Sequence, residues 1–531
     1  MLRKVTSILV PSLVFSAFAC GDDGVDIIPP PDGGEADSGQ AVDASRPPND
    51  SSAPVDAGTD AADANVPDPC ATDNGGCGPN ALCTAPSGTA VCTCKGGFSA
   101  DAGDAGQCED IDECATNNGG CSPNATCTNT GGGRTCTCNA SYEGGGETCT
   151  PATTTFSETT DLGITNTGSR TCADGGDMVS YSVTELGATS AKLSANVSAG
   201  CLSAGDEILL LNVQGTADSA VNTGHYERLV VSAVNGDTVT FTTTKTKFFG
   251  AAADSDANIG LSTDNQRVVV QRIPSYGNIV LDAGVSVTAP VWDGTKGGIF
   301  ALRAVGTVTV NGTIHMDGKG YRGGGSPLDN YSRGQQGESI RGLGALASTD
   351  AWNGGGGGGP GDGSCYGHGV GGTGGGYGTA GALGPKSCLD ISAAQSLTYG
   401  DAELATLHLG SGGGSGGNAN TLVDNPPGGH GGRGGGLVYI IAADGVSGTG
   451  MISARGGAGQ GDAAGVECRG ASQTDCWDYS GPGGGGSGGS VLVTAPSVTV
   501  PTSVSGGVGG NGHDSYAGDG GHGGAGRSKT N

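Results

Sequence analysis

Two six-cysteine units follow one another near the N-terminus, and they restrict what this part of the chain can fold into. The first five cysteines of each unit have the same spacing, and one residue separates the fourth from the fifth. Six cysteines within about forty residues leave no room for a large apolar core, so each unit must be held together by disulfides. Spacing alone leaves fifteen pairings open within a unit. The two sets are Cys70, Cys77, Cys83, Cys92, Cys94 and Cys108, and Cys114, Cys121, Cys127, Cys136, Cys138 and Cys149.

Both units, over residues 66–109 and 110–150, resemble the EGF-like module. The resemblance implies that the first cysteine pairs with the third, the second with the fourth and the fifth with the sixth. A disulfide framework of this kind is typical of secreted proteins, because the cytosol keeps thiols reduced. The implied disulfides are Cys70–Cys83, Cys77–Cys92, Cys94–Cys108, Cys114–Cys127, Cys121–Cys136 and Cys138–Cys149.

The composition of the chain favours a mostly β protein. Of 531 residues, 109 are glycine and only 4% are aromatic, which argues against one large, dense core. The formal net charge is −28. Nucleic acid and anionic lipid surfaces both require a basic patch, so we expect neither as a partner. Because extreme acidity also keeps a protein soluble, the charge by itself assigns no function.

Residues 1–19 have the features of a secretion signal, with a basic start followed by an apolar stretch too short to span a bilayer. The stretch ends in Ala-Phe-Ala before Cys20. This ending fits an ordinary cleavage site, and it also resembles a bacterial lipobox in which Cys20 becomes lipidated. The chain has 19 cysteines, so lipidation of Cys20 would leave an even number to form disulfides. We therefore favour a surface lipoprotein, held at the membrane by its lipid anchor alone.

The segments that flank the cysteine units differ sharply in pattern. Residues 20–65 consist largely of Asp, Ala, Pro and Gly, and we expect a disordered, self-repelling stalk. Residues 151–290 instead show short alternating segments that predict a β-rich domain. The more continuously apolar segment 207–213 predicts a buried strand. Segment 228–242 predicts a hairpin in which Asn235-Gly236 supplies two residues with positive φ.

Residues 291–531 form a Gly-rich region with a weak internal repeat, in which a pair of short strands precedes each Gly-rich excursion. Recurrent short strands indicate a parallel β-solenoid or a sandwich-like stack. Gly-rich runs are either flexible or form extended helices that pack closely, since no Cβ intervenes. We favour a partly ordered polyglycine assembly. Nearest-neighbour pairing predicts three further disulfides, Cys172–Cys201, Cys365–Cys388 and Cys468–Cys476.

A calcium site is expected at the start of the second unit. The sequence Asp-Ile-Asp-Glu before Cys114, with Asn129 downstream, resembles the calcium-binding EGF signature. The resemblance implies side-chain ligands and backbone carbonyl ligands for Ca²⁺, which binds six to eight oxygens. At Arg134 the family usually has an aromatic residue, and a cation near the site would weaken binding. The implied ligands are the side chains of Asp110, Glu113 and Asn129 and the carbonyls of Ile111, Thr130 and Gly133.

Two functions follow from these features. Residues 205–325 resemble a recurrent module of bacterial surface proteins, which implies a surface location. The first function is therefore a non-enzymatic, surface-anchored structural or adhesion protein with an extracellular protein or glycan as ligand. The alternative is a secreted polysaccharide-active enzyme on a β-solenoid, with Arg303, His315 and Asp317 as the nearest candidates for its chemistry. Trp292 is a candidate for stacking on a sugar or for capping a strand turn.

Overall fold

The computed structural model confirms a mostly β protein, and its described part contains no helix longer than a short 3-10 turn. No segment of that part forms a helix of the length and apolar character needed to cross a membrane. Residues Pro69–Asn531 form one compact unit. The structure describes residues 67–101, 104–168, 170–325, 333–343, 354–356, 369–385, 394–418, 427–461, 480–512 and 518–531.

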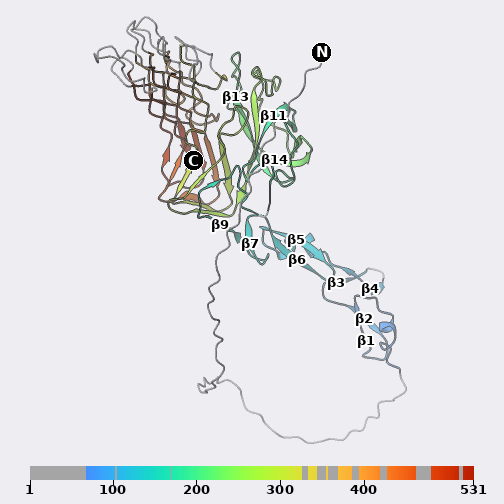
Figure 1. The fold of residues 1–531 in the computed structure, drawn as a ribbon. Coiled ribbons are helices and arrows are strands. Elements are labelled where there is room, and N and C mark those ends of the chain that lie inside the picture. The colour runs from blue at the N-terminus through green and yellow to red at the C-terminus, as the bar shows by residue number, and fades with distance from the viewer. Residues whose placement is uncertain are drawn as a thin grey trace, which may run out of the picture. The chain divides into compact units, whose positions relative to one another are not determined.

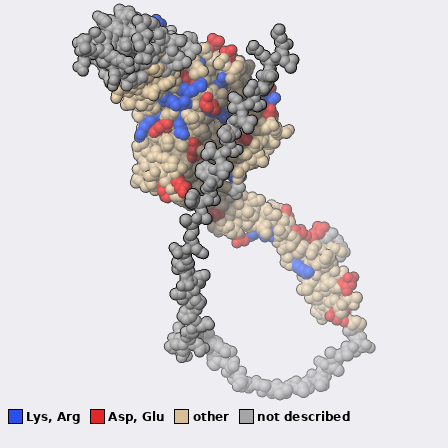
Figure 2. All heavy atoms as spheres, viewed as in Figure 1, with Lys and Arg blue, Asp and Glu red and all other residues tan. Residues whose placement is uncertain are grey.

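Each cysteine unit folds as small antiparallel hairpins tied by three disulfides, and the six bonds are those that the EGF resemblance implies. Among the residues of the first unit whose burial is described, only Cys77 and Ala81 are buried apolar residues, so the disulfides replace a core. Figure 2 shows acidic groups at several places along these units. The elements are η1 (Asp73–Gly76), β1 (Ala81–Thr84), β2 (Val91–Cys94), β3 (Phe98–Asp101), β4 (Asp104–Asp110), η2 (Glu113–Ala115), η3 (Asn117–Gly120), β5 (Ala125–Thr130), β6 (Gly133–Cys138), β7 (Tyr142–Gly144) and β8 (Cys149–Pro151).

The chain after the second unit forms a parallel β-solenoid, whose first strands are drawn in teal and whose later strands run from yellow-green to red in Figure 1. Three parallel sheets enclose an apolar interior that includes Leu281, Phe300 and Ile440. The first sheet contains β10 (Thr160–Asp161), β19 (Ser286–Thr288), β22 (Thr313–His315), β25 (Met451–Ser453) and β27 (Thr502–Ser503). The second contains β17 (Ser275–Tyr276), β20 (Ile299–Ala304), β23 (Leu437–Ala442), β26 (Ser490–Thr494) and β28 (Arg527–Thr530). The third contains β9 (Thr153–Phe156), β18 (Asn278–Leu281), β21 (Thr307–Val310) and β24 (Gly445–Ser447).

A closed antiparallel barrel is inserted between β10 and β17, after the first pass of the solenoid. The solenoid therefore takes strands from both the 151–290 and the 291–531 segments. Cys172–Cys201 forms beside the barrel core as expected. The barrel strands, in spatial order, are β11 (Ser180–Leu186), β12 (Ser190–Leu193), β15 (Thr238–Phe241), β14 (Tyr226–Asn235), β13 (Glu207–Gln214) and β16 (Arg267–Ile273).

Strand β13 is buried on both faces, as its continuous apolar run predicts. Ile208 and Leu210 point into the barrel core. Leu209 and Leu211 belong to a second cluster, where they pack with residues of the solenoid sheet such as Ile299. Both faces of this strand are apolar because each face packs into a different core.

The predicted hairpin forms between β14 and β15, but its turn differs from the expected one. Asn235 pairs with Thr238, so the two loop residues are Gly236 and Asp237. Only Gly236 has a positive φ, of 61°. A turn with glycine at its first central position needs a single residue in that region, which explains why Asn235 stays in the strand.

The Gly-rich runs form an ordered polyglycine lattice. Within the run 480–489, the backbone N–H groups of residues 481, 484 and 487 donate to the run 411–417, while those of 483, 486 and 489 donate to 454–460. The N–H groups of 485 and 488 donate to a third run, 521–524. Neighbouring N–H groups donate to different runs, and every third N–H group donates to the same run. The run is therefore an extended helix with three residues per turn.

The central run also accepts hydrogen bonds from three further runs, at 429–435, 372–375 and 507–510. It thus has six neighbours, which is close-packed order. A Cβ on Gly484 would overlap the carbonyl oxygen of Thr373. Glycine is required there because the backbones touch directly.

The outer runs follow a Gly-Gly-x pattern, in which the third residue faces solvent. His430, Ala458, Val508 and His522 are all exposed, while the glycines beside them are buried or half-buried against neighbouring backbones. Two of every three positions therefore contact the lattice and the third carries a side chain. This is the ordered form of the polyglycine assembly that the sequence favours.

Candidate functional site

The expected calcium site lies where the first cysteine unit passes into the second. Asp110 ends β4, and its carboxylate accepts hydrogen bonds from the Asn129 amide at 2.8 Å and from the Gly132 backbone N–H at 2.6 Å. Asn129 lies on β5, opposite Arg134 on β6. The hairpin of the second module thus brings two implied ligands together although they are separated by 19 positions in the chain.

Glu113 supplies a further sign of a cation site. Its Oε2 atom is buried and has no hydrogen-bond partner within the described residues. Asp112 caps the short helix η2 by accepting a hydrogen bond from the Cys114 N–H. A buried carboxylate oxygen without a donor fits a hard cation, because an unpaired buried charge is costly.

The donor set as a whole is compatible with Ca²⁺. The side chains of Asp110, Glu113 and Asn129 provide oxygen atoms, and the implied carbonyls of Ile111, Thr130 and Gly133 lie on the same junction and hairpin. No cluster of three or more His, Cys, Asp or Glu side chains occurs within the described ranges. A site here would depend on amide and carbonyl oxygens as well as on two carboxylates.

Arg134, the departure from the family pattern, turns toward the module's own disulfides. Its guanidinium lies 2.9 Å from the Cys136 sulfur and 3.4 Å from a carboxylate oxygen of Glu147. The side chain also packs against Gly119. Part of its charge is therefore offset by Glu147 within the second module.

The two modules touch through a small aromatic contact next to this site. The ring of Phe98 lies so close to Gly132 that a Cβ there would meet it at 2.6 Å. The Ile111 N–H donates to the Gly97 carbonyl at 3.0 Å. The aromatic residue that packs at the junction therefore comes from the first module.

The structure separates Arg303 from the other two candidates for polysaccharide chemistry, while Asp317 acts on the charge of His315. Arg303 is on β20 and binds Glu207 with two hydrogen bonds. His315 is on β22, a strand of a different sheet, and burial lowers its pKa. Asp317 accepts a hydrogen bond from the Arg455 backbone. Trp292 is fully buried, and its indole N–H donates to Glu338, so it does not stack on a ligand.

Other predicted positions lie outside the described residues. These are Cys20 and the expected pairs Cys365–Cys388 and Cys468–Cys476.

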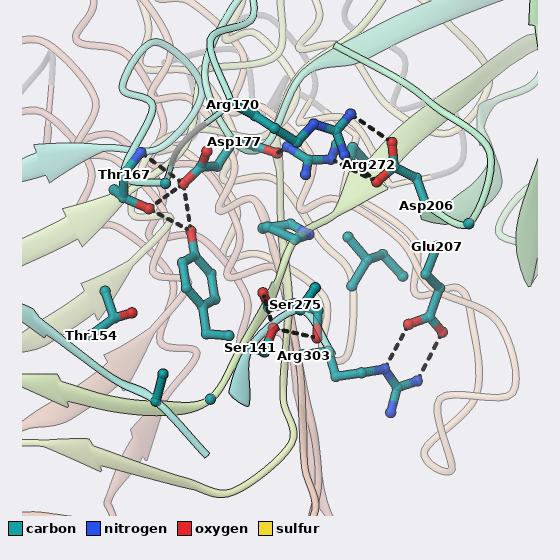
Figure 3. Close-up of a pocket in the computed structure, with 18 of the residues that line it drawn as sticks. Ser141, Thr154, Thr167, Arg170, Asp177, Asp206, Glu207, Arg272, Ser275 and Arg303 are labelled. Carbon is teal, nitrogen blue, oxygen red and sulfur yellow. Dashed lines mark hydrogen bonds and ion pairs between the residues drawn. The ribbon is translucent and has the colours of Figure 1, made fainter. Parts of the chain in front are cut away.

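A pocket that sequence reasoning missed lies where the second EGF module, the barrel and the first solenoid passes meet (Figure 3). Its volume is about 780 Å³. The side chains that define it are Ser141 of the module, Thr154, Ser275, Tyr276 and Arg303 of the solenoid, Glu207, Val230 and Arg272 of the barrel strands, and Thr167, Arg170, Asp177 and Asp206 of the segments beside them. The adjacent acids Asp206 and Glu207, at the start of the apolar strand β13, are a local signal that could have pointed there.

Ion pairs fix the charged side chains of this pocket. Arg170 contacts both carboxylate oxygens of Asp206, at 2.5 and 2.8 Å. Arg303 contacts both oxygens of Glu207, at 2.6 and 2.8 Å. Burial would raise the pKa of Glu207, but the hydrogen bonds and charge of Arg303 outweigh it and hold the pKa below its usual range. The Glu207 carboxylate is therefore ionised at neutral pH, and the two bidentate pairs orient both carboxylates.

Comparison with known proteins identifies only the second cysteine unit. Residues 114–149 match the EGF domain family. Together with the disulfides, this domain indicates an extracellular protein. No curated protein matches the chain.

Three solved phage tailspikes are similar to parts of the chain. Their TM-scores of 0.13, 0.13 and 0.14 are too low to carry any argument about fold or function, and the chain covers 25%, 26% and 42% of their lengths. They are gp49 of Pseudomonas phage LKA1 (17% identity over 26% of this chain), Gp54 of Acinetobacter baumannii phage AP22 in complex with a capsular saccharide (12% over 27%) and gp61 of Pseudomonas phage phi297 (10% over 61%).

Proposed function

We propose that this chain is a non-enzymatic, surface-anchored structural or adhesion protein whose EGF pair binds Ca²⁺ and projects the solenoid from the cell. The observation that carries the proposal is the direct connection between the second module and the solenoid. One residue, Ala152, separates β8 from β9. Its backbone N–H donates to the carbonyl of Ser141 in the second module, and its carbonyl accepts from the N–H of Asn278 in the solenoid. A chain without a flexible linker at this point suits a rigid projecting scaffold.

Further contacts support the rigidity of this connection. The Ser141 hydroxyl donates to the Ser275 carbonyl at 2.9 Å, and Gly277 leaves no room for a Cβ beside Ala152. Ca²⁺ at Asp110 would add the same rigidity to the junction of the two modules. The polyglycine lattice extends the scaffold beyond the solenoid sheets, because its six-neighbour packing fixes each run. Binding by loops on a fixed scaffold is the usual division of labour in surface proteins.

The membrane attachment that we propose is a lipid on Cys20. Cells that express the chain and are labelled with a radioactive fatty acid should incorporate label into the wild-type protein and not into Cys20→Ser. Label that persists in Cys20→Ser would contradict this anchor.

The adhesion function is tested with cells that display the full chain. We expect them to attach to a surface coated with an extracellular protein or with a polysaccharide, and to attach less after Ca²⁺ is removed with a chelator. Cells that lack the chain serve as the control. Equal attachment of both cell types to every coating would leave only a structural role.

A further inference from the structure

We infer that the pocket between the second EGF module, the barrel and the solenoid binds an uncharged, hydroxyl-rich saccharide. The inference rests on the proposed function, since it names the ligand class and the place at which adhesion would occur. Nothing in the sequence motifs assigned this pocket. It is built from the arrangement of Arg303, Glu207, Arg170, Asp206 and Ser141, which come from distant parts of the chain (Figure 3).

The charged side chains that line the pocket disfavour a strongly charged ligand, because they already pair with one another. Three arginines and three acidic residues line it, and each of these charged groups has a partner. Arg272, in addition to the pairs described above, lies 3.6 Å from Asp206. An anion or a cation would have to compete with an existing ion pair and bear the desolvation cost of the group that it displaces. An uncharged ligand meets no such competition.

Apolar atoms form the larger share of the lining surface, but the polar groups set among them favour a ligand that can also form hydrogen bonds. Hydroxyl groups of Ser141, Thr154 and Ser275 join the guanidinium and carboxylate groups around the cavity. Tyr276 and Thr167 both donate to Asp177, so the third acid is held as well. The wall therefore presents donors and acceptors side by side, which suits the hydroxyls of a sugar, since each hydroxyl both donates and accepts.

The size and rigidity of the pocket agree with this ligand class. Small-molecule pockets typically enclose about 300–1,000 Å³, and this one encloses about 780 Å³. The bidentate pairs of Arg303 with Glu207 and of Arg170 with Asp206 fix both planar groups before a ligand arrives. Side chains that are ordered in advance lower the entropy cost of binding.

The inference is tested by calorimetric titration of the full chain with defined probes. The probes are neutral oligosaccharides of glucose, galactose and mannose, the corresponding monosaccharides and an oligosaccharide of uronic acid. We expect saturable binding of at least one neutral probe. A response to the oligomer alone would indicate a polysaccharide source, and a response to the monosaccharide a free sugar; both support the saccharide class. Binding of the uronic acid probe alone, or of no probe, would refute the inference.

Two variants test whether binding occurs in the pocket, and both leave its ion pairs intact. Val230 and Thr154 both line it, and Val230→Trp and Thr154→Trp should each weaken binding at least tenfold by filling the cavity. Ser232→Trp and Thr155→Trp are the matched controls, at exposed positions of the same two strands that do not line the pocket. Wild-type affinity in both pocket variants would refute the site. Far-UV circular dichroism and thermal melting establish that the variants are folded.

Failure of this inference can be told apart from failure of the proposed function. If displaying cells adhere and the Val230→Trp chain adheres equally well, the pocket is not the adhesion site, while the adhesion function stands. If the wild-type chain adheres to no coating but binds a neutral saccharide in the titration, the adhesion function fails, while the pocket assignment stands.

Discussion

The buried carboxylate of Glu338 accepts a 3.1 Å hydrogen bond from the indole nitrogen of Trp292. The same carboxylate accepts from the side chains of Gln214, at 3.0 Å, and of Arg322, at 2.9 Å. Glu338 thereby joins the barrel strand β13, the solenoid and a run of the polyglycine lattice. With Glu338 only 1% exposed, these contacts form one buried polar network.

We expect Glu338→Ala to be strongly destabilising. It leaves the Arg322 guanidinium without its carboxylate and the buried Trp292 indole N–H without its acceptor, and it removes one of the two hydrogen bonds of the Gln214 amide, a loss of about 3–5 kcal/mol in the free energy of unfolding. Chemical denaturation of the full chain measures the effect. Glu403→Ala removes a carboxylate that is 78% exposed in its pair with Lys529, and should change stability by less than about 1 kcal/mol. Similar losses in the two variants would contradict the network.

Gly484→Ala should disrupt the polyglycine lattice at its centre. The added methyl group would overlap the Thr373 carbonyl, so the two runs must separate. We expect faster hydrogen exchange at the amides of residues 372 and 375, whose hydrogen bonds end on the run that contains Gly484. Val508→Ala, at an exposed outer position, is the control and should leave exchange unchanged. Unchanged exchange in Gly484→Ala would show that the lattice is not close-packed there.

Calcium binding should depend on Asn129. Calorimetry of the full chain should give a dissociation constant of about 10⁻⁴–10⁻³ M, the range of extracellular modules, and Asn129→Ala should weaken it by at least tenfold. Asn124→Ala, outside the implied ligand set, should bind as the wild type does. If removal of Asn129 has no effect, the proposed ligand set is wrong.

His408 should make the chain less stable in mild acid. Burial lowers its pKa to about 3, whereas an unfolded histidine titrates near 6.5. Between these values the unfolded chain binds more protons, so this residue's contribution to stability falls as pH decreases from about 6.5 toward 3. Tyr377, Tyr399, Asp401 and Arg527 surround it or act on its charge.

The measurement compares melting temperatures at pH 7 and pH 4.5 for three chains. The wild type should lose stability over this range by more than His408→Asn, in which no group takes up that proton. His430→Asn, at an exposed position, should follow the wild type. An equal loss in wild type and His408→Asn would show that His408 does not control this pH dependence.

Local spacing was enough to predict several features of this protein. The cysteine spacing indicated two EGF-like units and, by resemblance, the bonds of Cys70–Cys83 and its five counterparts. A disulfide within so few residues depends mainly on local chain geometry. The run at 207–213 indicated a buried strand. The glycine runs indicated close backbone packing, because no other residue permits it.

Tertiary structure decided what distant residues do together. Arg303 looked like a candidate for chemistry, yet it is held by Glu207, 96 positions earlier in the chain, after the inserted barrel packs against the solenoid sheet. The pocket beside this pair exists only because the second EGF module, the barrel and the solenoid meet. Sequence alone determined the units and their local backbone, since these depend on near neighbours. The internal repeat left a solenoid and a sandwich-like stack both open, and long-range packing decided between them, as it decided the six-neighbour lattice and the pocket, because local spacing does not specify which distant segments meet.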